Sequence, residues 1–83
     1  MTEDKIIEKL TELFRELFDD DTIVLRPDTT ADDIDGWDSF THLNMIIAVE
    51  AQFGIRIHPK EVEALTNVGD LVTLIGARQG KTD

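Results

Sequence analysis

Apolar residues recur in the first part of the chain with the spacing of one helix face. Their positions fall on one side of a helix with about 3.6 residues per turn: Ile6, Ile7, Leu10, Leu13, Phe14, Leu17 and Phe18. This period predicts an amphipathic helix. Thr2 is its candidate N-cap, because a threonine hydroxyl can accept a hydrogen bond from a free amide of the first turn. Consecutive aspartates at 19–21 end the pattern.

A second apolar segment, residues 39–53, contains neither glycine nor proline. Its apolar positions cover a broad face, as expected of a helix that packs on more than one side: Phe40, Leu43, Ile46, Ile47, Val49 and Phe53. The connection between these helices, residues 19–38, exceeds the length of about 12 to 15 residues beyond which connections are often functional. Its scattered apolar residues predict a loop pinned to the core: Ile23, Val24, Leu25, Ile34 and Trp37.

The segment after the second helix contains two residues that interrupt helices. Gly54 stands where a left-handed residue often ends a helix. Residues 55–58 are predicted to be extended, since Pro59 disfavours helical backbone before it. They are compatible with a short strand that lacks an evident partner strand. Pro59 itself suits the first turn of a short helix that runs through about Leu65.

The last predicted helix has Thr66 or Asn67 as its cap and a further set of periodic apolar positions: Val68, Leu71, Val72, Leu74 and Ile75. Residues 76–83 are predicted to fray. The pattern therefore predicts an all-α fold, a small four-helix bundle of three main helices and one short helix, with a long loop between the first two. We expect one domain, residues 1–76, and a flexible tail, residues 77–83. So short a chain has little core to give up to a deep cavity, and its function is expected at the surface.

Composition narrows the classes of partner. With 8 Lys and Arg against 18 Asp and Glu, the net charge is −10, which disfavours nucleic acid and membranes and favours basic protein surfaces. The absence of cysteine excludes disulfides and suits a reducing cytoplasm. The acidic start is unlike a signal peptide, and the longest apolar run, residues 45–49, is too short to span a bilayer. A cytoplasmic location is expected.

An acidic part of the long connection partly matches a calcium-binding loop. Asp33, Asp35 and Gly36 correspond to positions 3, 5 and 6 of such a loop, but Ala31 and His42 would stand at the ligand positions 1 and 12. Neither of these residues supplies the carboxylate that the site requires. The sequence therefore favours a solvated acidic loop.

Asp38, Ser39 and His42 are the residue types of a hydrolytic triad. The sequence offers neither an evident oxyanion hole nor room for a substrate cavity, so we expect no catalytic residue and no enzymatic activity. His42 is expected to be an exposed helix residue. His58 lacks ligand-type spacing to it, and no metal site is expected.

Ser39 lies where the long connection meets the second helix, a place where Asp38 or Ser39 could serve only as a helix cap. The wider segment changes this interpretation. Gly36-Trp37-Asp38-Ser39-Phe40-Thr41-His42-Leu43 closely resembles the attachment motif of the acyl carrier protein family, usually Asp-Ser-Leu ahead of an apolar helix. The resemblance covers roughly residues 3–76 and includes the proline near the start of the short helix.

The resemblance implies a covalent cofactor on Ser39. A phosphopantetheinyl transferase, using coenzyme A and magnesium, would attach 4′-phosphopantetheine to this hydroxyl, and the thiol of the arm would carry an acyl group as a thioester. The new phosphodiester would lie at a helix N-terminus, which favours negative charge by about 0.3 to 1 kcal/mol. The resemblance also implies a docking face for partner enzymes: Asp38, Phe40, Leu43, Asn44, Ile47 and Glu50.

The implied partners are the transferase and acyl-loading and acyl-processing enzymes with basic or apolar docking patches, acting on a monomer. The face is less acidic than in carriers of bacterial fatty acid synthesis, because Thr41, Asn44 and Ala51 stand where acidic residues are common there. Since charge complementarity sets partner choice, these departures argue against housekeeping fatty acid biosynthesis and favour a dedicated pathway such as polyketide or other specialised acyl biosynthesis. Two alternatives remain, an aminoacyl or peptidyl carrier and an unmodified acidic helical interaction module.

Overall fold

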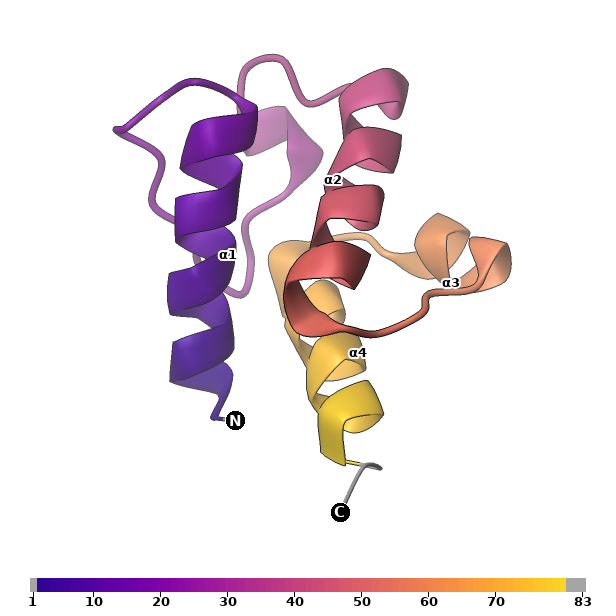
Figure 1. Ribbon diagram of the computed structural model, residues 1–83. Helices are drawn as coiled ribbons and strands as arrows, with labels where there is room; N and C mark the ends of the chain where they lie inside the picture. The colour runs from indigo at the N-terminus through magenta and orange to yellow at the C-terminus, as the bar shows by residue number, and fades with distance from the viewer. Residues whose placement is uncertain (1, 81–83) are drawn as a thin grey trace.

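The computed structural model describes residues 2–80. Within them the chain forms four α-helices and one short 3-10 helix and contains no strand (Figure 1): α1 (Glu3–Leu17), η1 (Ala31–Asp33), α2 (Ser39–Phe53), α3 (Pro59–Ala64) and α4 (Val68–Gly80). The predicted all-α bundle is confirmed. The start of α1 and the end of α4 lie at one end of the bundle, and α2 begins at the other (Figure 1). None of these helices is long and apolar enough to cross a membrane.

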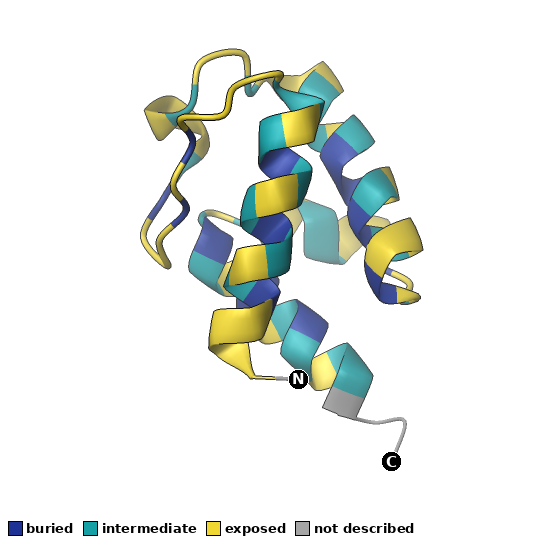
Figure 2. Ribbon diagram, turned by 60° about the vertical axis from the view of Figure 1, so that its left-hand side comes forward, coloured by how far each residue is buried: buried dark blue, intermediate teal, exposed yellow. Residues whose placement is uncertain are grey.

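The core lies between α1, α2 and α4, where α1 packs against both of the other helices. Figure 2 shows that the buried positions recur along one side of the helices, with exposed positions between them. The fully or nearly fully buried residues of the three helices are Ile6, Leu10, Phe14, Met45, Ile46, Val49, Phe53, Val68, Leu71, Val72 and Ile75. The predicted faces of α1 and α4 are thus faces that pack together, and their burial is the main source of stability. On α2 the prediction is only partly right: Ile46, Val49 and Phe53 are buried. Phe40, Leu43 and Ile47 are exposed instead, so this helix does not bury its whole apolar face.

The long connection is pinned to this core, as predicted. Ile23 and Leu25 are buried, whereas Val24 between them is 66% exposed. The Arg15 side chain of α1 donates a hydrogen bond from Nε to the Ile23 carbonyl oxygen at 2.8 Å. Alternate side chains of this extended stretch therefore point into the core, while a cation on α1 holds its backbone.

The same connection also supplies acceptors to the start of α4. The amide of Val68 donates to the Thr29 carbonyl at 2.8 Å, and the amide of Gly69 donates to the Pro27 carbonyl at 2.7 Å. Asn67 caps the helix through its side-chain oxygen, which accepts from the Asp70 amide at 2.8 Å. First-turn amides have no partner within their own helix, so these bonds join the loop to α4 where the helix most needs acceptors.

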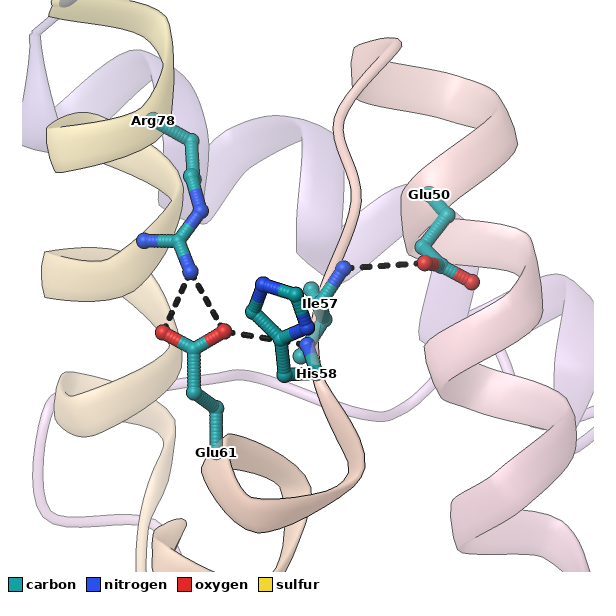
Figure 3. A network of polar contacts seen from close by, with 5 residues as sticks. All are labelled: Glu50, Ile57, His58, Glu61 and Arg78. Atoms are coloured by element: carbon teal, nitrogen blue, oxygen red, sulfur yellow. Dashed lines mark hydrogen bonds and ion pairs between the residues drawn. The ribbon is translucent and has the colours of Figure 1, made fainter.

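Between α2 and α3 the chain turns at Gly54, which has a left-handed backbone with φ of 65°. Residues 55–58 are not part of a strand. Instead, the Ile57 amide donates to the Glu50 carboxylate at 2.9 Å, so a side chain of α2 supplies the acceptor that a neighbouring strand would otherwise provide (Figure 3). Residues 55–58 are therefore extended, as predicted, and the short strand that the sequence left possible is absent from residues 2–80.

The C-terminal part of α4 is longer than predicted. The helix continues to Gly80, and the predicted frayed tail is wrong for residues 76–80; residues 81–83 lie outside the described residues. Arg78 forms an ion pair with Glu61 of α3 (Figure 3), and the Gln79 side chain donates to the Phe53 carbonyl at 3.4 Å. These contacts hold the last turn of α4 against α2 and α3.

Candidate functional site

Ser39 is the first residue of α2 and is exposed. The cap of this helix is Asp38, whose Oδ1 accepts from the Thr41 amide at 3.0 Å. That bond is the main cause of the lowered pKa of the Asp38 carboxyl. Within residues 2–80 the Ser39 hydroxyl has no hydrogen-bond partner. Since Asp38 performs the capping, the hydroxyl of Ser39 is free for chemistry.

Thr41 holds in place the backbone of residues 36–38, which leads into the serine. Its hydroxyl accepts from the Asp38 amide at 2.8 Å and donates to the Gly36 carbonyl at 2.7 Å. Gly36 itself has φ of +87°, a backbone conformation that favours glycine. An aspartate at position 41 could not donate to that carbonyl when ionised. From the sequence, Thr41 was notable only because an acidic residue is common at this position in related carriers. Its role in holding the backbone before Ser39 depends on tertiary geometry, which residue spacing does not show.

Trp37 anchors the same segment to the bundle. Its ring meets that of Phe14 edge-on at a centroid distance of 5.2 Å and stacks on His42 at 5.9 Å. Its Nε1–H donates to His42 Nδ1 at 3.0 Å. Trp37 therefore ties α1 to the first turn of α2 directly before the serine. This contact gives a structural role to Trp37 that the sequence alone left unassigned.

The triad-like residues do not form a catalytic arrangement. His42 is half-buried rather than exposed as predicted, because it packs against Trp37. Its Nδ1 accepts from Trp37, and no hydrogen bond joins it to Ser39 in the described chain. Asp38 is bonded to Thr41 and does not orient the histidine. Nor do residues 2–80 bring together three side chains of the kind that hold a metal ion.

The cavity next to this segment is small. It has a volume of about 50 Å³ and lies among Trp37, Met45 and Leu71. Pockets that bind small molecules are usually about 300 to 1,000 Å³. Ser39 therefore offers an exposed hydroxyl at a helix end, and the cavity among Trp37, Met45 and Leu71 is too small to hold a substrate.

The predicted docking residues differ in exposure. Phe40 is 73% exposed, and Leu43 and Ile47 are each 57% exposed. Asp38 is exposed, while Asn44 is half-buried. Glu50 is also half-buried, with its carboxylate bonded to the Ile57 amide. The apolar members of the predicted face are thus exposed to solvent. The Glu50 carboxylate instead accepts a hydrogen bond from the backbone of the same chain.

Comparison with known proteins adds a family to this geometry. The family model described as "Phosphopantetheine attachment site" matches residues 8–75. A protein of Acidothermus cellulolyticus named "Acyl carrier protein" is 33% identical over 90% of this chain and 89% of its own length. The chain belongs to the acyl carrier protein family. An acyl carrier protein of Lactobacillus acidophilus is 32% identical over 96% of this chain and 100% of its own length.

A solved structure agrees with this membership. The solution structure of a holo acyl carrier protein from Geobacter metallireducens matches with a TM-score of 0.86 and 42% identity, covering 92% of this chain and 87% of that one. The predicted family, fold and covalent 4′-phosphopantetheine cofactor are therefore confirmed for this carrier.

Proposed function

We propose that this carrier receives 4′-phosphopantetheine on Ser39 and holds acyl intermediates as thioesters on the thiol of the arm. The observation that carries the proposal is the state of the serine, which is exposed at the first position of α2 with a hydroxyl that caps nothing. Ser39 is also the only serine in the chain. No other side chain of the predicted motif offers a free hydroxyl, since that of Thr41 is bonded on both sides.

The residues around Ser39 fit a phosphodiester. Attachment would form a bond from Ser39 Oγ to the phosphorus of the arm, with adenosine 3′,5′-bisphosphate leaving coenzyme A. The helix N-terminus stabilises the resulting anion by about 0.3 to 1 kcal/mol. The transferase supplies the base that takes the serine proton, because His42 Nδ1 accepts from Trp37 and no hydrogen bond joins His42 to Ser39 within residues 2–80. The carrier needs no catalytic residue of its own.

Partner enzymes are proposed to dock beside the serine on the first three turns of α2. The exposure of Phe40, Leu43 and Ile47 supports this placement, and Asp38 borders them at the helix start. The pathway served, whether fatty acid, polyketide or other specialised acyl biosynthesis, stays open, as do the aminoacyl or peptidyl carrier and the unmodified interaction module. A cytoplasmic monomer remains our prediction.

Intact-mass measurement tests the proposal. The protein is incubated with coenzyme A, magnesium and a broad-specificity phosphopantetheinyl transferase, and we expect a mass gain of one phosphopantetheinyl group. Ser39→Ala should gain nothing. Thr73→Ala, on the exposed side of α4, is the matched control and should be loaded like the wild type. If the wild type gains no mass while another carrier is loaded in parallel, the proposed function is wrong.

A further inference from the structure

Three large apolar side chains form an exposed ridge along α2. Phe40, Leu43 and Ile47 are spaced three and four residues apart and therefore share one helix face. The ridge begins at the residue after Ser39. Of the large hydrophobic side chains exposed in residues 2–80, only Val24 in the long connection lies outside it. Exposed apolar residues that gather on one face indicate a binding surface more strongly than scattered ones do.

The ridge lies in an uncharged part of a strongly acidic chain. The net charge is −10, yet residues 39–49 contain no Asp, Glu, Lys or Arg. Asn44 stands beside the ridge as a neutral, half-buried side chain. The negative charge that would attract a basic partner is therefore carried by other parts of the chain.

The two acids that border the ridge already have partners within the chain. Asp38 accepts from the Thr41 amide at 3.0 Å. Glu50 accepts from the Ile57 amide at 2.9 Å, and Figure 3 shows its carboxylate directed toward the backbone of that residue. Each of these two carboxylates stabilises a backbone amide of the chain itself, and neither belongs to the ridge. The ridge itself offers no carboxylate to a basic partner.

From these observations we infer that partner enzymes, the phosphopantetheinyl transferase among them, recognise this carrier through an apolar concave patch that covers the ridge. Basic groups on the partner contribute little at this face. The inference rests on the proposed function and names the chemistry of the partner surface. It resolves the choice between basic and apolar docking patches, because the ridge offers apolar area and residues 39–49 contain no carboxylate.

Loading by a broad-specificity transferase, with coenzyme A and magnesium, serves as the probe. Leu43→Gln and Ile47→Gln should each lower kcat/KM about tenfold, as expected for an apolar side chain that becomes buried at an interface. Val24→Gln is the matched control, because it makes the same change at an exposed apolar residue away from the ridge. It should be loaded at the wild-type rate. Helical circular dichroism checks folding, and Leu43→Ala and Ile47→Ala replace any glutamine variant that unfolds.

Charge is tested at the same face with Asn44→Lys and Asn44→Glu. Apolar recognition predicts kcat/KM values within about threefold of each other, whereas a basic partner surface would favour the glutamate over the lysine by tenfold or more. The inference is overturned if the ridge variants are loaded like Val24→Gln, or if the Asn44 pair separates by that margin. Failure of the wild type to be loaded at all refutes the proposed function instead, so the two failures are distinguishable.

Discussion

The hydrogen bond between Trp37 and His42 should stabilise the segment that leads into Ser39. Nε1 of Trp37 lies 3.0 Å from Nδ1 of His42, and the two rings stack. Trp37→Phe removes the donor and keeps an aromatic ring against Phe14. A net hydrogen bond contributes about 0.5 to 1.5 kcal/mol. Because the aromatic pair is kept, we expect the free energy of unfolding to fall by about 0.5 to 1.5 kcal/mol.

A double-mutant cycle separates the bond from the ring. His42→Leu removes the acceptor and introduces leucine, which favours helices. Each single variant loses the same hydrogen bond, so the double variant loses it only once. Its cost should be smaller than the sum of the single costs by about 0.5 to 1.5 kcal/mol. Trp37 is the only tryptophan in the chain, so its replacement removes the tryptophan fluorescence that could report unfolding. Urea unfolding is therefore followed by circular dichroism. Each kcal/mol also corresponds to about 4 to 8 °C in Tm for a domain of this size.

The control cycle pairs Trp37→Phe with His58→Leu, an exposed histidine at the start of α3. These two changes should be additive. If the Trp37 and His42 changes are equally additive, the bond contributes nothing to stability and the reasoning from its geometry is wrong.

Three further predictions concern glycines and acid. Gly69→Ala should destabilise by about 1 to 3 kcal/mol in thermal unfolding, because its Cβ would lie 2.7 Å from the Pro27 carbonyl oxygen. Gly76→Ala, with only Ile6 Cδ1 at 3.8 Å, should instead stabilise by about 0.5 to 1 kcal/mol; equal effects of the two substitutions would contradict the packing. Gly54→Ala should cost about 1 to 2 kcal/mol, since its φ is 65°, and an unchanged Tm would refute this. Hydrogen bonds lower the folded-state pKa of four acids, and protonation of these acids breaks those bonds. In a pH series of urea unfolding, the free energy of unfolding should therefore fall as the pH drops below the ordinary carboxyl pKa values of 3.8 and 4.5. A free energy of unfolding that stays constant down to about pH 2 would rule this out. The four are Asp20, Asp38, Glu61 and Asp70.

Local signals in the sequence were sufficient for most of the helices. The helices α1 and α2, the cap at Thr2 and the left-handed Gly54 depend on residues within one or two turns of each other, and the structure confirms each of them. The candidate serine was found in the same way, since its motif is a short continuous segment. Whether the serine or its neighbour caps α2 was open, because both residue types are good caps; backbone geometry assigns that role to Asp38.

Other features depend on residues that meet only after folding. The end of α4 is held by Arg78 on Glu61 and by Gln79 on Phe53, partners 17 and 26 residues away in the chain. No local propensity reports such contacts, so the sequence predicted a frayed tail where a helix forms. Glu50 illustrates the same limit at the docking face. Its position on α2 follows from the helical period, but only the path of residues 55–58 decides that its carboxylate binds the Ile57 amide. The sequence by itself thus determined the helices and the serine between loop and helix, because these are encoded by neighbours, while tertiary packing decided which polar groups remain free for a partner.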